Sequence, residues 1–191
     1  MSRFPIDFWQ KLLGAEVSPI KARDIIASLD PLLAIDFDAL SRNPLLTSCE
    51  SERMSQTVLE HLHKYHSNTL HVIEESDFPE TLIQAENSPT AFFYEGNIEA
   101  LHAPLVGIVG TREATVYGRA VARKFSERLA EAGVTVVSGG ALGIDAASHE
   151  GALAVGGRTI AVMGSGLDQP YPAMHRGLFQ KISVNGGLLS T

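Results

Sequence analysis

Cysteine and long hydrophobic runs are both scarce in this chain of 191 residues. Cys49 is the only cysteine in the sequence, which excludes an internal disulfide framework and favours a reducing compartment. No apolar run approaches the roughly 20 residues that a membrane-spanning helix needs. The N-terminal residues, Met1 to Asp7, also lack the apolar core of a signal peptide. These absences predict a cytoplasmic protein without a membrane partner.

Familiar nucleotide-binding and catalytic motifs are absent as well. The turn Gly110-Thr111-Arg112 does not continue as the G-x-G-x-x-G fingerprint of dinucleotide-binding folds, and no G-x-x-x-x-G-K-[ST] phosphate loop occurs. His149 shares a helix face with Asp145, but no second histidine or cysteine stands at ligand spacing. A structural hydrogen bond is therefore the favoured role for His149. With no nucleophile–base set and no metal cluster, we expect neither catalysis nor a cofactor.

The net charge of −7 argues at first against a nucleic-acid partner. The charge is unevenly distributed, however. From Pro104 onward the chain has eight basic and six acidic residues, a balance of +2, which leaves −9 for residues 1–103. Because binding follows the local potential rather than the total, the C-terminal part can still hold a nucleic acid.

Residues 1–67 are expected to form a small helical domain. Phe8 and Leu12 have helical spacing, and Ser18 with Pro19 predicts the start of a helix that buries Ile20 and Ile25. A plain bundle whose apolar faces form a core is the favoured interpretation. A helix-hairpin-helix-like or SAM-like module that contacts DNA or protein is the alternative, but no basic hairpin supports it. Residues 68–103 then form a connecting segment with short strands.

Residues 104–191 alternate apolar strands with helices, a pattern typical of a parallel sheet with helices on both faces. Strands are expected at 104–109, 134–137 and 159–163, followed by a last apolar run at 187–191. Helices are expected at 115–132, 144–155 and 174–184. In the first of these helices we expect Val121, Phe125 and Leu129 on the buried face, and Gly133 at its C-terminal end.

Two glycine-rich loops follow the first two of these strands. They lie side by side at the carboxyl edge of the expected sheet, where open α/β sheets bind ligands. Arg112 in the first loop suits a phosphate, because its planar guanidinium donates two parallel hydrogen bonds. A structural ion pair with Asp145 or Glu113 is an equal alternative. The glycines of the second loop can serve a tight turn or the close approach of a ligand. Tyr171 can stack on a base or hold its own loop.

Several short motifs follow one another along residues 77–191. They are Phe78-Pro79, Phe93-Tyr94-Glu95-Gly96-Asn97, Val106-Gly107-Ile108-Val109-Gly110-Thr111-Arg112, Tyr117-Gly118, Ser138-Gly139-Gly140-Ala141-Leu142-Gly143-Ile144-Asp145, Gly151-Ala152-Leu153 and Gly166-Leu167-Asp168 with Tyr171-Pro172. Each motif is weak alone. In this order and spacing they resemble the DNA-processing protein A family (DprA, also called Smf).

The resemblance implies a Rossmann-like DNA-binding domain over 104–191, incomplete at its C-terminus, after a SAM-like helical domain. It implies a non-enzymatic protein that binds single-stranded DNA and loads the RecA recombinase onto incoming DNA in natural transformation. The family forms homodimers, with a dimer surface in a segment that this chain lacks. The residues implied at the DNA site, with Tyr171 added as a base-stacking platform, are Gly110, Thr111, Arg112, Ser138, Gly139, Gly140, Ala141 and Tyr171.

Three departures from the family pattern stand out. Ser148 replaces a usual alanine, His175 replaces a common asparagine, and a later glutamate-proline and Arg-Asn-Arg segment is missing. Two other functions compete with the DNA-binding hypothesis. One is a nucleotide-cleaving enzyme of the phosphoribohydrolase type, whose Pro-Gly-Gly-x-Gly-Thr motif and catalytic glutamate are not in this chain. The other is an interaction module whose acidic N-terminal domain binds a protein.

Overall fold

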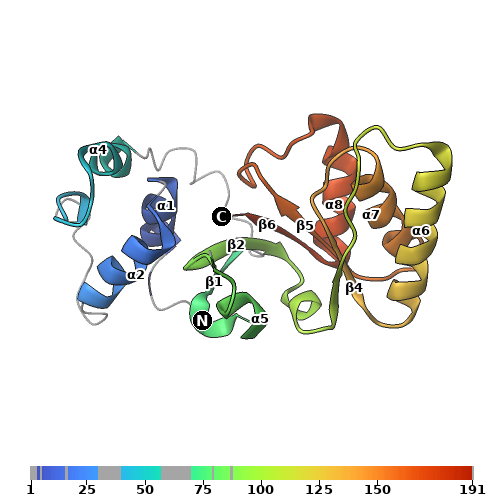
Figure 1. Ribbon diagram of the computed structural model, residues 1–191, viewed down its shortest axis with the longest axis horizontal. Helices are drawn as coiled ribbons and strands as arrows, with labels where there is room; N and C mark the ends of the chain where they lie inside the picture. Colours follow the sequence, from blue (N-terminus) through green and yellow to red (C-terminus); the bar gives the residue numbers. More distant parts are fainter. Residues whose placement is uncertain are drawn as a thin grey trace. The chain divides into compact units, whose positions relative to one another are not determined.

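The computed structural model describes Phe4 and residues 6–15, 17–29, 40–56, 70–78, 80–86 and 88–190. It contains one six-stranded sheet (Figure 1). In spatial order the strands are β1 (Leu70–Glu74), β2 (Ala91–Gly96), β6 (Gly187–Ser190), β5 (Thr159–Met163), β4 (Thr135–Ser138) and β3 (Leu105–Gly107). None of the helices in these ranges is long and apolar enough to cross a membrane.

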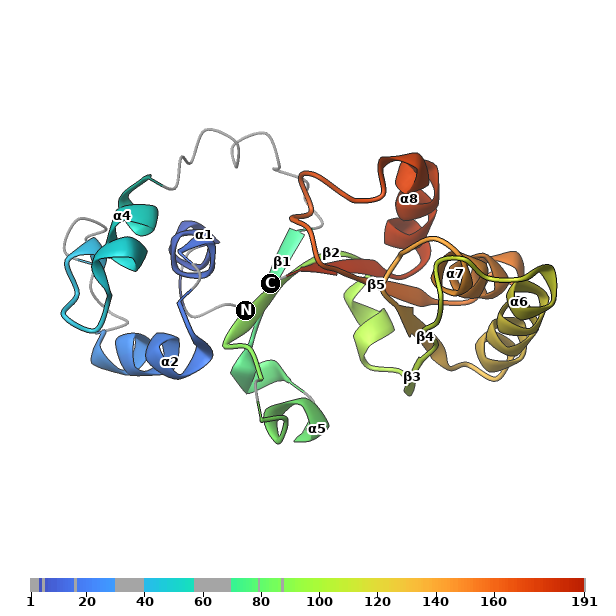
Figure 2. The same cartoon turned by 45° about the horizontal axis from the view of Figure 1, so that its top comes forward.

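The strands β3, β4, β5 and β6 are parallel, which confirms the expected α/β pattern. The helices α6 (Val116–Glu131), α7 (Ile144–Ala154) and α8 (Arg176–Asn185) connect them in turn, the last after the 3-10 turn η5 (Ala173–His175). Each connection moves to the neighbouring strand in the same direction. Right-handed crossovers therefore place α6, α7 and α8 on the same face of the sheet (Figure 2). The α/β class is thus confirmed, but the prediction that these helices cover both faces is wrong, because the strand order never reverses within this part of the chain. The carboxyl ends of all four strands meet at one edge.

The connecting segment adds two strands to this sheet. β2 pairs antiparallel with β6, with Phe93 opposite Ser190 and Gly96 opposite Gly187, so the sheet as a whole is mixed. Gly96 has a φ of +135°, and a Cβ there would collide with the Gly186 carbonyl. β2 therefore ends at a position that only glycine fills without strain. The 3-10 helix η4 (Ile98–Leu101) then leads to β3.

By its internal contacts the chain forms two compact units. One comprises Met1–His66 and Val72–Phe92, and the other comprises Ser67–His71 and Phe93–Thr191. The strands of the connecting segment are thus shared between the units. The division into segments 1–67, 68–103 and 104–191 stays a prediction about independent folding.

The first unit contains the helices α1 (Ile6–Gly14), α2 (Pro19–Ser28) and α4 (Ser48–Gln56), with the 3-10 turn η3 (Glu75–Asp77) and the short helix α5 (Glu80–Ile83). Ser18 caps α2, because its side chain accepts a hydrogen bond from the Lys21 amide. Phe8, Leu12 and Ile25 are fully buried as expected, whereas Ile20 is 72% exposed, against the prediction. Ile20 lies in the first turn of α2, on the side of the helix opposite to the buried Ala22 and Ile25. The apolar spacing of Val58, Leu59 and Leu62 predicts a further helix, and these residues lie outside those that the structure describes.

Helix α6 shows the largest departure from the sequence prediction. Thr115 caps it by accepting from the Gly118 amide at 3.0 Å, and Gly133 follows its end with a φ of +81°, the second as expected. Phe125, however, is 64% exposed, and the buried positions are Ala122 and Ser126. Small side chains face α7 because the two helices approach closely. A Cβ on Gly151 of α7 would collide with the backbone carbonyl of Arg123 in α6.

Candidate nucleic-acid interface

The carboxyl edge of the parallel strands brings three loops together, namely residues 108–115, 139–143 and 164–172. Hydrogen bonds fix these loops to one another. Ser138 Oγ donates to the Ile108 carbonyl at 2.6 Å, which joins the ends of β3 and β4. His175 Nδ1 donates to the Gly140 carbonyl at 3.0 Å, which ties the second loop to η5. The predicted neighbourhood of the loops is therefore confirmed.

Arg112 lies in the first loop with an exposed side chain. Neither Asp145 nor Glu113 forms an ion pair with it, nor does any other carboxylate within the described ranges. The alternative role considered for Arg112, a structural ion pair with Asp145 or Glu113, is therefore not found. The backbone N–H groups of Gly110, Thr111 and Arg112 also have no acceptor among the residues that the structure describes. A free guanidinium beside three free amides is a surface suited to an anion.

The second loop is organised by the Asp145 carboxylate at the start of α7. Asp145 Oδ2 accepts hydrogen bonds from the amides of Gly139 at 3.1 Å and Ala141 at 3.4 Å. Those two amides are thus satisfied within the protein. The Gly140 amide, between them, has no acceptor in the described part of the chain. Asp145 is buried, so it holds this loop from the inside and the loop forms a wall beside the first one.

The glycines around the two loops have packing roles inside the protein. A Cβ on Gly110 would lie 2.6 Å from Ile144 Cγ1, and one on Gly139 would lie 2.9 Å from Asp145 Oδ2. Gly140 has a φ of +69° and its Cβ would meet the Phe179 ring, while Gly143 has a φ of +83° and abuts the Thr111 carbonyl. The glycine pattern is thus explained by close packing and turns, the first of the two roles considered for it.

His149 is fully buried between α7 and the sheet and forms a structural hydrogen bond, as the sequence favoured. Its Nδ1 lies 2.7 Å from Thr159 Oγ1, which donates its own proton to the Val136 carbonyl at 2.7 Å. Nδ1 must therefore be the donor, since a hydroxyl has one proton. Burial, and then the nearby charge of His175, lower the pKa of His149 to about 4. The described residues include no group of three or more side chains suited to hold a metal ion.

Exposed apolar side chains surround the loops at the carboxyl edge. Tyr171 is 71% exposed, and its amide donates to Ser165 Oγ at 3.2 Å, so its loop is held while its ring stays accessible. Val109, Leu142 and Met174 are also exposed there, and sequence reasoning missed them. The available signal was an apolar residue inside an otherwise polar or glycine-rich loop. Such side chains are suited to contact the flat faces of unpaired bases.

Comparison with known proteins agrees with this architecture. A family model described as DNA recombination-mediator protein A matches residues 69–191. Protein Smf of Synechocystis is 43% identical over 121 residues, which cover 61% of this chain and 30% of that protein. DNA processing protein DprA of Streptococcus pneumoniae is 39% identical over 113 residues, 59% of this chain and 40% of that protein. This chain thus spans less than half the length of these relatives.

Two solved structures share the fold. The X-ray structure of DprA from Streptococcus pneumoniae matches all of this chain and 67% of its own, with a TM-score of 0.74 and 27% identity. A DprA structure from Helicobacter pylori, described by its single-stranded DNA binding mode, matches 63% of this chain and 54% of its own, with a TM-score of 0.57 and 32% identity. The family model covers well over half of the sequence, so this chain belongs to the DNA recombination-mediator protein A family, whose members process DNA.

Proposed function

We propose that this protein binds single-stranded DNA at the carboxyl edge of its sheet and presents it to the RecA recombinase. The observation that carries the proposal is the Arg112 guanidinium beside the amides of Gly110 and Thr111, all without a partner among the residues that the structure describes. These groups bind the phosphate backbone, which every sequence shares. Binding is therefore insensitive to base sequence and weakens as salt is added.

Each predicted residue has a distinct role in this proposal. Gly110, Thr111 and Arg112 hold a phosphate in the first loop. Ser138, Gly139, Gly140 and Ala141 form the wall beside it, and the Gly140 amide supplies a further donor. Tyr171, exposed in the third loop, stacks on a base. The protein acts by binding, without a catalytic group.

Support for the partners is of two kinds. Single-stranded DNA is the ligand named for the Helicobacter pylori relative, which shares the fold and 32% of its aligned residues with this chain. RecA loading, homodimer formation and a cytoplasmic site of action are further parts of the proposal, and only family membership supports them.

The Arg112→Gln variant tests the proposed site. Removing one charge-assisted contact is expected to weaken binding of a labelled oligo-dT about 10-fold, equally for other sequences, and to flatten the salt dependence. Fluorescence anisotropy at low and moderate salt measures both effects. Arg158→Gln is the matched control, because Arg158 lies at the amino end of β5, away from the loops, and its guanidinium donates to the Gly133 carbonyl.

Unchanged affinity in Arg112→Gln, or equal losses in both variants, would remove Arg112 from the site. Failure of the wild-type protein to bind oligo-dT would reject DNA binding by this chain. Release of a free base from a nucleoside monophosphate would support the phosphoribohydrolase hypothesis in its place.

A further inference from the structure

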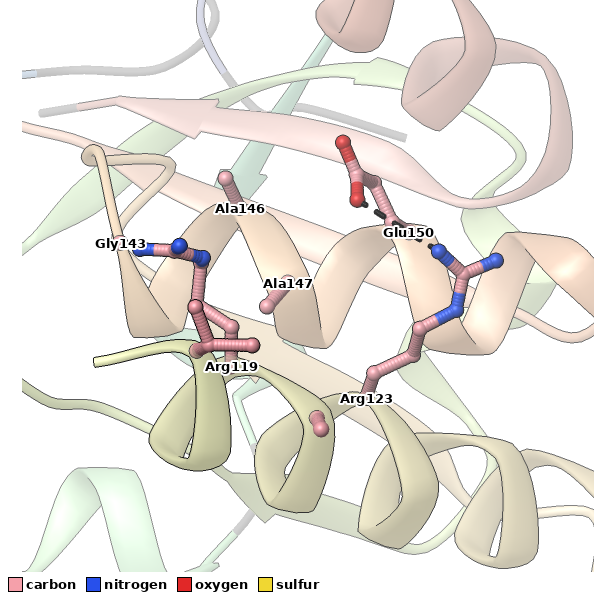
Figure 3. A pocket seen from close by; sticks show the side chains of 8 residues that line it. Arg119, Arg123, Gly143, Ala146, Ala147 and Glu150 are labelled. Atoms are coloured by element: carbon pink, nitrogen blue, oxygen red, sulfur yellow. Dashed lines mark ion pairs between the residues drawn. The ribbon is translucent and has the colours of Figure 1, made fainter. Parts of the chain in front are cut away.

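A groove of about 330 Å³ runs between α6 and α7, beginning next to the first loop. Arg119 and Arg123 line it from α6, and Gly143, Ala146, Ala147 and Glu150 line it from α7 (Figure 3). Gly143, Ala146 and Ala147 leave the end of the groove near Arg119 without long side chains on the α7 side, and Glu150 lines the other end. Arg119 and Arg123 are therefore the side chains that can donate hydrogen bonds to a ligand in this groove.

The two arginines differ in their partners. Arg123 lies 3.4 Å from a Glu127 oxygen and 3.9 Å from a Glu150 oxygen, so its charge is balanced. Arg119 hydrogen-bonds only to the Ala114 carbonyl and meets no carboxylate in the described portions of the chain. The charge of Arg119 is therefore not compensated within the described residues, and it leaves one end of the groove positive.

That positive end adjoins the proposed DNA site. The Ala114 carbonyl that Arg119 contacts belongs to the same loop as Arg112, two residues further on. Gly143, at the same end of the groove, abuts the carbonyls of Thr111 and Arg112. Figure 3 shows the Arg119 guanidinium beside Gly143, whereas Arg123 turns toward Glu150 at the other end. The loop and the groove therefore form one continuous surface.

We propose that the α6–α7 groove is a second phosphate subsite, where Arg119 binds a phosphodiester of the strand held at Arg112. This proposal rests on the proposed function and extends the DNA path from the carboxyl edge onto the helical face. Arg119 donates to the phosphate oxygens, and the small residues of α7 admit the backbone. Arg123, held by Glu127 and Glu150, keeps the far wall in place.

The test compares a short oligo-dT that spans only the loops with a longer one that reaches the groove. Arg119→Gln is expected to weaken the longer oligonucleotide about 5-fold and to leave the short one nearly unchanged. It should also reduce the slope of log affinity against log salt by about 0.7, the value for one phosphate contact on a single strand. Arg128→Gln is the matched control, because Arg128 lies on the same helix, outside the groove, and pairs with Glu131.

The Arg119→Lys variant separates charge from loop structure, because lysine keeps the charge without the planar guanidinium. Lysine should restore the salt slope and most of the affinity. Equal losses in Arg119→Gln and Arg128→Gln, equal losses on both oligonucleotides, or no rescue by lysine would each overturn the groove subsite. Loss of binding in Arg112→Gln with no change in Arg119→Gln would reject the groove and keep the proposed function. No binding by the wild-type protein would reject both.

Discussion

At the scale of single residues, the sequence identified the groups but not their partners. The sequence predicts correctly that Arg112 lies in a loop. Whether Arg112 forms an ion pair with Asp145, however, depends on where α7 begins. That carboxylate instead accepts from two amides of the second loop. Side-chain partners of this kind depend on loop backbone geometry, which spacing alone does not encode. For His149 the spacing suggested a hydrogen bond, while its partner, Thr159, lies on a strand.

His149 should make the stability of the protein sensitive to acid. Its pKa of about 4 in the folded state lies below the ordinary value of 6.5, so the unfolded chain takes up the proton first as pH falls. The contribution is fully present above pH 6.5 and is lost as pH falls toward 4, by up to about 3 kcal/mol. Chemical denaturation at a series of pH values measures this loss.

His149→Asn provides the control for that measurement. The asparagine amide can still donate to Thr159, but it has no proton to gain in this range. The variant should therefore be less stable at neutral pH and should show a flatter profile between pH 6.5 and 4. Parallel profiles for the two proteins would show that other groups determine the acid sensitivity.

At the scale of elements, periodicity located the helices and strands but misassigned some of their faces. The rule that large apolar residues face inward failed for Phe125, because α6 packs through Ala122 and Ser126 against a glycine of α7. Close helix packing selects small residues, and a single sequence does not show which neighbour a helix meets. β3 illustrates the same limit. Its residues read as a covered strand, yet all three are exposed because β3 is an edge strand.

A pair of glycine substitutions tests the close packing of α6 and α7. Gly151→Ala should destabilise the protein by about 1–3 kcal/mol, because its methyl group would strike the Arg123 backbone. Gly177→Ala in α8 should stabilise it by about 0.5–1 kcal/mol, because open space surrounds that position and alanine favours the helix. Thermal or urea denaturation of the two variants gives both values. Equal stability of Gly151→Ala and the wild type would show that the helices can separate at little cost.

At the scale of the whole molecule, the alternation of strands and helices was enough to predict the parallel part of the sheet. It was not enough to predict that β2 would add to β6, since antiparallel pairing across such a sequence distance leaves no local signal. The candidate site was likewise predictable only in part. The sequence located the two loops, because parallel strands must bring them to one edge, whereas the α6–α7 groove needed the helix positions.

Charge distribution gives a prediction for the chain as a whole. The net charge is −7, but residues 104–191, which contain Arg112 and Arg119, carry +2. If the local potential governs binding, added salt should weaken the complex with oligo-dT, with a negative slope of about 0.7 per phosphate contacted. If repulsion by the acidic residues 1–103 governs it, salt should screen that repulsion and strengthen binding. Anisotropy titrations over a salt series distinguish the two by the sign of the slope.

We expect the negative sign for two reasons. Arg112 and Arg119 have no carboxylate partners within the described structure. In the acidic part of the chain, Glu50 is already paired with Lys21 and Glu75 with Arg23.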